Sequence, residues 1–278
     1  MSDVIKIEGL TKTYGKKRGV TDLTLKVKEG EIYGFIGPNG AGKSTTIRSM
    51  LGFLNFDSGK IEIFGRDSRS EHTAILKDVG YMPSEALFYP AMKVSEVISF
   101  AAQVRGLDCR KEAAMLCERL QLDTNKRIKE LSLGNRKKVS IVCAMQHKPK
   151  LFIFDEPSSG LDPLMQNTFF TLIKEYVREG ATCFLSTHVL SEVSRYCERA
   201  AVMREGRLIR EDSVENLTES SAKTVKLSVD GVQEEYIFNG DINELVSELA
   251  KKKLDNLYIE EPSLEEMFMH FYEGKEGK

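Results

Sequence analysis

The chain carries the stretch GPNGAGKS at residues 37–44, and this stretch decides its fold. The apolar segment Glu31–Ile36 precedes it and predicts a strand, while Ser44–Phe53 follows with the spacing of a helix. A glycine-rich loop between a strand and a helix points backbone N–H groups at phosphate oxygens. Lys43 adds a positive charge for the β- and γ-phosphates, and the Ser44 hydroxyl suits Mg²⁺. The stretch therefore predicts a nucleotide-binding loop.

Short segments rich in branched and aromatic residues surround this loop and predict strands. They are Ile5–Leu10, Leu23–Val27, Glu31–Ile36, Lys60–Phe64, Leu151–Phe154, Thr182–Ser186 and Ala200–Arg204. Longer segments with helical spacing lie between several of them. They are Ser44–Phe53, Val94–Arg105, Arg110–Leu120, Arg136–Gln146 and Pro163–Glu179. This arrangement predicts an α/β fold in which helices cover a sheet.

The chain is expected to contain two parts. Residues 1–212 form the α/β part, and helix formers replace strand signals between about residues 86 and 150, which predicts an inserted helical subdomain. Residues 213–278 have a different pattern and predict a small α+β unit. Its expected elements are a hairpin of Lys223–Val229 and Glu234–Phe238, a helix at Ile242–Lys252, a strand at Leu257–Glu260 and a last helix at Ser263–Tyr272.

Composition and charge narrow the function classes. The 40 basic residues nearly balance the 42 acidic ones, and a net charge of −2 gives no field for holding nucleic acid, so we expect no nucleic-acid partner. Charged residues interrupt every apolar run before the roughly 18 residues that a membrane-spanning helix needs. Met1–Leu10 has no apolar signal sequence, and the 5 cysteines lack zinc-site spacing. We therefore expect a cytoplasmic protein.

A second chemical signal lies at the end of the apolar segment Leu151–Phe154, where Asp155 and Glu156 follow directly. A buried strand would present both carboxylates at its end, with Asp155 holding Mg²⁺ and Glu156, on the opposite side of the pleat, deprotonating a water molecule. His188 follows the strand predicted at Thr182–Ser186, where its imidazole could reach a γ-phosphate or the attacking water. These residues predict hydrolysis of a nucleoside triphosphate.

Further motifs in the same order resemble those of the ATP-binding cassettes of ABC transporters. The sequence LSLGN at residues 131–135 is similar to their LSGGQ signature, and SGLD at residues 159–162 is similar to their D-loop. His188 matches their switch histidine, and Tyr14 matches the aromatic residue that stacks on adenine. The resemblance covers roughly residues 4–210 and implies a P-loop NTPase cassette that binds ATP with Mg²⁺ and hydrolyses it.

The resemblance also implies the residues of the site. Those expected to contact ATP are Tyr14, Gly37, Pro38, Asn39, Gly40, Ala41, Gly42, Lys43, Ser44 and Thr45. Ser44 and Asp155 would hold Mg²⁺, and Glu156, His188 and Lys43 would act in catalysis. In the family, the signature and D-loop complete the ATP site of a second cassette, a role that here falls to Ser132, Gly134 and Asp162. The implied partner is thus another cassette, as a homodimer or a heterodimer.

The sequences GYMPSE at 80–85, ALFYP at 86–90 and EPSLEEMF at 261–268 together resemble ATP-binding subunits of ABC-2 type exporters. Such subunits pair with a separate transmembrane permease, which implies a peripheral position on the inner face of the cell membrane. The apolar run Leu87–Tyr89 is either a docking surface for that permease or part of the helical subdomain's own core.

Some features depart from the family pattern or leave alternatives. Leu133 and Asn135 replace the usual Gly and Gln of the signature, and Ser132 alone would also be an ordinary helix N-cap. Ser84, followed by Glu85, stands where the family usually has a glutamine that reaches the metal, and no role is carried over to either residue.

Two other classes of function require sequence features that differ from those of this chain. A GTPase switch needs an Asn-Lys-x-Asp loop, but residues 125–128 read NKRI and lack the acid. The alternative within the family is a soluble ABC-type ATPase that acts as a regulatory or binding module. Such proteins usually carry two fused cassettes or a long coiled coil, whereas this chain has one cassette and no heptad run.

Overall fold

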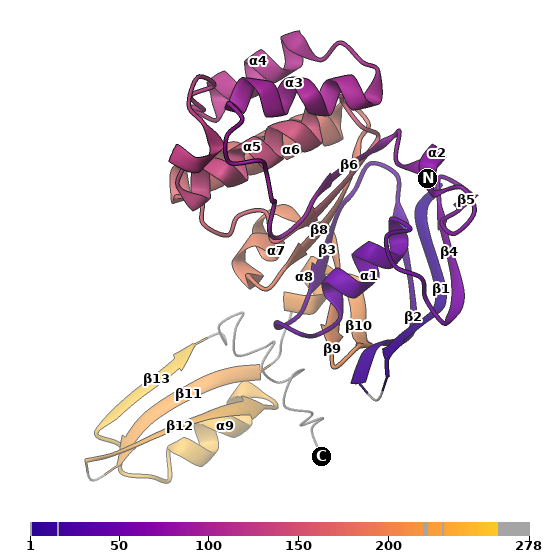
Figure 1. The fold of residues 1–278 in the computed structure, drawn as a ribbon. Helices are drawn as coiled ribbons and strands as arrows, with labels where there is room; N and C mark the ends of the chain where they lie inside the picture. The colour runs from indigo at the N-terminus through magenta and orange to yellow at the C-terminus, as the bar shows by residue number, and fades with distance from the viewer. Residues whose placement is uncertain (1, 16, 219–221, 230, 261–278) are drawn as a thin grey trace. The chain divides into compact units, whose positions relative to one another are not determined.

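The computed structural model describes residues 2–15, 17–218, 222–229 and 231–260 (Figure 1). The chain divides into two compact units, Met1–Glu211 and Asp212–Lys278, which are described separately. Among the described helices, none has the length and apolar composition needed to cross a lipid bilayer.

A six-stranded sheet forms the centre of the first unit. Its strand order is β10 (Arg207–Ser213), β9 (Arg199–Arg204), β3 (Ile32–Ile36), β8 (Thr182–Thr187), β7 (Leu151–Asp155) and β6 (Val79–Met82). β3 pairs in parallel with β8 and β9, and β7 pairs in parallel with β6 and β8. Every residue of β3, β7 and β8 is buried, and the apolar residues that predominate in them suit strands covered on both faces.

A second, antiparallel sheet packs in the same core. Its strand order is β2 (Lys17–Lys28), β1 (Asp3–Tyr14), β4 (Ser58–Ile63) and β5 (Arg66–Asp67). Helix α1 (Lys43–Met50) contributes Ile47 and Met50 to a buried cluster that also contains Ile5 and Ile7 of β1 and Phe35 of β3. The helix that follows the nucleotide-binding loop is therefore fixed by apolar contacts with both sheets.

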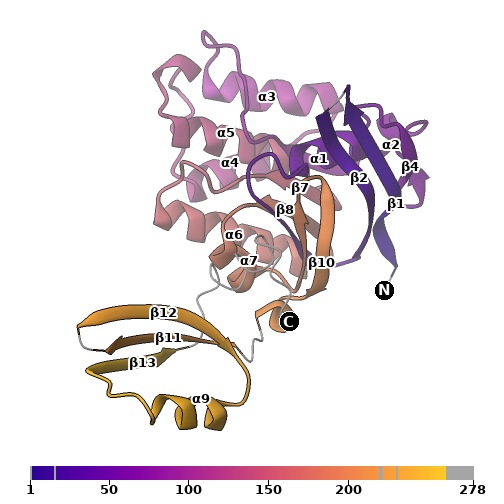
Figure 2. The ribbon, with the colours of Figure 1, turned by 90° about the horizontal axis from the view of Figure 1, so that it is seen from below.

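The longer helices of this unit other than α1, and a 3₁₀ turn, lie between residues 94 and 178. They are α3 (Val94–Arg105), α4 (Arg110–Arg119), the 3₁₀ turn η1 (Ile128–Glu130), α5 (Leu133–Met145) and α6 (Pro163–Arg178). Figures 1 and 2 show α3, α4 and α5 grouped together, and α5 packs against α3, α4 and β6. Short helices α2 (His72–Ile75) and α7 (Leu190–Tyr196) complete the unit.

Most predicted elements are confirmed, with a few corrections. α5 begins at Leu133 rather than at the predicted Arg136, because Ser132 caps it. The strand β6 was not predicted, because Gly80 interrupts its apolar sequence. A Cβ atom on Gly80 would lie 2.2 Å from the carbonyl oxygen of Ala144, so the glycine allows α5 to approach the strand.

The second unit contains α8 (Val214–Thr218), a sheet of order β12 (Val232–Asn239), β11 (Ala222–Val229), β13 (Asn256–Glu260), and α9 (Ile242–Leu249). The predicted hairpin and third strand are confirmed by the antiparallel pairing of β11 with both neighbours. α9 ends at Leu249, earlier than the predicted Lys252, and buries Leu245 and Leu249 against Val225 and Leu227. The helix predicted at Ser263–Tyr272 and the exporter-like sequence at 261–268 lie outside the described residues.

Candidate functional site

The loop between β3 and α1 turns sharply and brings backbone amides to one point. Gly40 and Gly42 adopt φ angles of 84° and 104°, in the left-handed region that glycine adopts readily. A Cβ atom on Gly42 would also lie 2.7 Å from the carbonyl oxygen of Gly19. Gly42 occupies the N-cap position of α1 without a side-chain hydrogen bond, so the first amides of the helix are available to an anion.

Lys43 opens this helix and turns its ammonium back over the loop. Its side chain is only 6% exposed, and Nζ donates a 2.6 Å hydrogen bond to the carbonyl oxygen of Gly37. The same Nζ lies 3.3 Å from Oε1 of Glu156. The loop lysine and the carboxylate proposed as the base are therefore directly paired.

Asp155 ends β7 and binds two hydroxyl groups. Ser44 Oγ donates to Oδ2 over 2.7 Å, and Ser186 Oγ, from the adjacent strand β8, donates to Oδ1 over 2.9 Å. The carboxylate is 2% exposed, so these bonds fix its orientation. The Ser44 hydroxyl and the Asp155 carboxylate form a pair of hard oxygen donors, which is the type of ligand that Mg²⁺ prefers.

Glu156 does not continue the pleat of β7, contrary to the prediction. Its φ of 52° is left-handed, and its amide donates to the carbonyl oxygen of Ser186 over 2.9 Å. This turn places Oε2 2.6 Å from Nδ1 of His188, a hydrogen-bond distance. Oε1 is buried and accepts no hydrogen bond within the described ranges, although Lys43 Nζ is at ion-pair distance.

A cavity of about 260 Å³ lies over the loop and contains most of the predicted ATP contacts. Its lining residues are Tyr14, Gly19, Pro38, Asn39, Gly40, Gly42, Lys43, Ser44, Thr45, Ser84 and Glu156. The Tyr14 ring is 47% exposed, and its hydroxyl lies 3.5 Å from Thr45 Oγ1. Gly37, Ala41, Asp155 and His188 do not line this cavity. The first three lie next to lining residues in the sequence, and His188 contacts the lining residue Glu156.

Sequence reasoning missed Gly19, Ser84 and Ser186. Gly19 lies beside Tyr14, where a Cβ atom would come within 2.9 Å of the ring. Ser84 had been noted as a departure from the family but received no role. The sequence did contain a signal for Ser186, because it is a polar residue at the end of the buried segment Thr182–Ser186. The parallel strand next to that segment ends at Asp155.

The signature and D-loop residues lie apart from this cavity. Ser132 caps α5 by accepting a hydrogen bond from the amide of Asn135, 3.3 Å away, and Asp162 caps α6 by accepting one from Met165, 3.0 Å away. Gly134 belongs to the first turn of α5 rather than preceding the helix. A Cβ atom there would lie 2.5 Å from the carbonyl oxygen of Gly160, so the signature packs against the D-loop.

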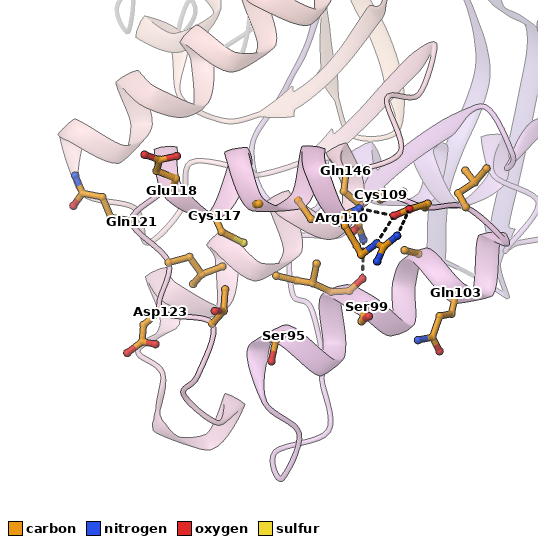
Figure 3. Close-up of a pocket in the computed structure, with 18 of the residues that line it drawn as sticks. Ser95, Ser99, Gln103, Cys109, Arg110, Cys117, Glu118, Gln121, Asp123 and Gln146 are labelled. Atoms are coloured by element: carbon orange, nitrogen blue, oxygen red, sulfur yellow. Dashed lines mark hydrogen bonds and ion pairs between the residues drawn. The ribbon is translucent and has the colours of Figure 1, made fainter.

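A larger cavity of about 1110 Å³ lies between α3 and α4 (Figure 3). Figure 3 shows side chains from both helices around it, including Ser95, Ser99 and Cys117. It contains none of the predicted site residues, so the nucleotide site is assigned by its chemistry and not by cavity size.

Comparison with known proteins identifies the family of this chain. The family model described as "ABC transporter" matches residues 20–159, half of the chain. This chain belongs to the ABC transporter family. The bacitracin transport ATP-binding protein BcrA of Bacillus licheniformis is 35% identical over 232 residues, which cover 82% of this chain and 76% of that protein. The Nod factor export ATP-binding protein I of Rhizobium etli is 32% identical over 248 residues, covering 87% and 76%.

Solved structures of ABC cassettes have the same fold. The ATP-binding subunit of an ABC transporter superposes with a TM-score of 0.72 at 30% identity and covers 77% of this chain and 91% of its own. A dimeric bacterial ABC transporter cassette gives a TM-score of 0.68 at 26% identity, with coverages of 76% and 98%. The predicted α/β cassette is confirmed, and the chain is an ABC ATPase that binds and hydrolyses ATP.

Proposed function

We propose that this ABC ATPase powers a separately encoded membrane permease of the exporter type, by hydrolysing ATP with Mg²⁺ between two cassettes. The observation that carries the proposal is the convergence of Lys43, Ser44, Asp155, Glu156 and His188 at the carboxyl edge of the parallel sheet. Ligands of open α/β sheets bind at this edge.

Glu156 is the proposed base. Its carboxylate accepts a proton from a water molecule as the water oxygen bonds to the γ-phosphorus of ATP. The bond from that phosphorus to the β,γ-bridging oxygen then breaks, giving ADP and phosphate. His188, 2.6 Å from Oε2, orients the carboxylate. Lys43 and the loop amides stabilise negative charge on the phosphoryl oxygens.

Ser44 and Asp155 are the proposed holders of Mg²⁺. Their oxygens already lie 2.7 Å apart, and Ser186 restrains the carboxylate from the other side. When bound, the cation would neutralise charge on the β- and γ-phosphate oxygens. The arrangement of this chain's residues fits that role, because a few protein oxygens plus phosphate oxygens are the usual Mg²⁺ ligands in such sites.

The second cassette is proposed from the position of the signature. Ser132 and Gly134 stand at the N-terminus of the 13-residue helix α5 and outside the cavity that contains Lys43. Backbone amides at this helix end favour an anion, and a second copy or a paralogue would supply that anion as its bound ATP. A dimeric structure of a related cassette supports this arrangement.

The permease is proposed to dock at an apolar groove of about 930 Å³ beside the loop that follows β6. Leu87 and Tyr89 line it and are 94% and 74% exposed, so they are not part of the helical subdomain's own core. Phe100 and Val104 of α3 form the facing wall and are also exposed. Relatives named for bacitracin transport and Nod factor export support an exporter.

Each half of the proposal has its own experiment. Phosphate release by the purified chain should require Mg²⁺ and disappear in Lys43→Ala, but persist in the control Lys60→Ala, whose side chain is exposed on β4. Persistent Mg²⁺-independent turnover would contradict the site. Co-expression with a candidate permease of the exporter type should yield a complex that Leu87→Ser weakens. The exposed α6 residue Leu164 supplies the control Leu164→Ser, and equal loss in both variants would contradict docking at the groove.

A further inference from the structure

Lys137 is a buried lysine that the proposed mechanism does not use. It lies in α5, the helix capped by the signature residue Ser132, and it is 6% exposed. Its Nζ donates a 2.6 Å hydrogen bond to the carbonyl oxygen of Ser84. Burying an ammonium costs free energy unless polar groups compensate, so this contact is a specific feature of the fold.

Negative charge surrounds this ammonium. Burial lowers the pKa of Lys137 below its usual value, and the carboxylates of Asp155, Glu156 and Glu85 oppose that shift. Two of these carboxylates belong to the proposed hydrolysis site. Lys137 does not itself line the cavity over the nucleotide-binding loop, but the carbonyl that it binds belongs to Ser84, which does.

Ser84 belongs to the segment that connects β6 to α3. The residue lines the nucleotide cavity together with Lys43, Ser44 and Glu156. A few positions later, Leu87 and Tyr89 line the apolar groove. The bond from Lys137 thus fastens the cavity end of this connecting segment, three residues before Leu87, to the helix that begins at the signature.

We propose that Lys137 is a positioning residue for ATP hydrolysis, whose ammonium holds the backbone at Ser84 against the nucleotide cavity next to Glu156. The proposal rests on the role of Glu156 as the base. The segment between β6 and α3 has no glutamine that could reach the site. Instead, Lys137 of α5 restrains the segment through its hydrogen bond to the main-chain carbonyl of Ser84. A loosened segment would admit bulk water and misplace the reacting groups, which lowers turnover more than ATP binding.

The adjacent residue provides a matched control. Lys138 lies in the same helix and is 8% exposed, but its side-chain ammonium makes no hydrogen bond or ion pair within the described part of the chain. Lys137→Met removes the ammonium while keeping an unbranched side chain. Lys138→Met makes the same change one position later, and Lys137→Arg restores a cation that can donate to Ser84.

The experiment combines kinetics with hydrogen exchange of the nucleotide-free protein. In Lys137→Met, kcat should fall about tenfold and KM for ATP should change less than about twofold, because the P-loop still binds the phosphates. Amide exchange across residues 84–89 should accelerate about tenfold. Lys137→Arg should recover at least part of both losses, and Lys138→Met should match the parent.

Several outcomes would overturn the proposal. One is parent-like exchange at residues 84–89 in Lys137→Met, whatever its turnover. Another is an equal change of kcat and amide exchange in Lys138→Met, which would mean that both substitutions act by disturbing the packing of α5. If Lys137→Met fails to fold, Lys137→Gln takes its place under the same criteria. Exchange does not depend on catalysis, so a failure of Glu156 as the base would be seen separately in Glu156→Gln.

Discussion

Replacing Glu156 with glutamine separates the chemistry of this site from its binding of ATP. The amide keeps the volume of the side chain but cannot accept the proton of the attacking water. It also removes the charge that pairs with Lys43 Nζ at 3.3 Å and changes the group that faces His188 Nδ1 at 2.6 Å. Turnover and affinity should therefore change in opposite directions.

The expected sizes follow from these contacts. Loss of a positioned base lowers kcat by about 10² to 10⁴. At 3.3 Å the Lys43–Glu156 pair has a gross attraction of about 5 kcal/mol for an effective dielectric constant of about 20, and most of it is offset by the desolvation of both groups. The ion pair therefore has a net stabilisation of about 1 kcal/mol, which is lost when ATP binds to Lys43. The variant lacks this ion pair, so it should bind ATP about fivefold more tightly than the parent.

Two assays measure these changes. Phosphate release under saturating MgATP gives kcat, and equilibrium titration with a fluorescent ATP analogue gives Kd. The exposed Glu205 supplies the control Glu205→Gln, which should match the parent in both. A kcat within about threefold of the parent would refute Glu156 as the base. Unchanged or weaker ATP binding would refute the competition between Glu156 and the phosphates for Lys43.

Three further substitutions test other parts of the site. Lys43→Ala should weaken ATP binding about tenfold or more, because a charge-assisted contact with the phosphates is lost; a titration that overlays the parent's would place the nucleotide elsewhere. Ser132→Arg should leave ATP binding to the monomer within about twofold but reduce turnover at least tenfold, and parent-like turnover would contradict a role across the dimer. Ser84→Gln should lower the Mg²⁺ concentration that gives the half-maximal ATPase rate, because Ser84 lines the cavity. Glu85 is exposed, so Glu85→Gln should give the same Mg²⁺ titration curve as the parent. Titration curves that overlay for the parent and both variants would show that Ser84 does not reach the metal.

The central sheet could be predicted because its strands are buried on both faces. Ile32–Ile36 and Leu151–Phe154 are continuous apolar runs, and each is followed by residues whose chemistry suits phosphate or metal binding. The strand Val79–Met82 could not be predicted in the same way. It has four residues, and Gly80 serves the close approach of a helix that lies far along the chain.

The contacts that orient the site could not be read from the sequence. Glu156 adopts a left-handed turn that favours glycine or asparagine, and the pattern of strand Leu151–Asp155 suggested continued pleating instead. The bonds of Ser186 to Asp155 and of Lys137 to Ser84 join residues 31 and 53 positions apart. Such pairs are determined by strand order and helix packing, which local spacing does not specify.

The mass of the Glu156→Gln variant in solution, measured by light scattering with and without MgATP, tests the proposed pairing of two cassettes. Because this variant should bind ATP without hydrolysing it, the paired state should accumulate. The monomer of 31.3 kDa should be replaced by a species of twice that mass when MgATP is added, and Ser132→Arg in the same background should prevent the change. A mass that stays at the monomer value under saturating MgATP would contradict hydrolysis between two copies of this chain.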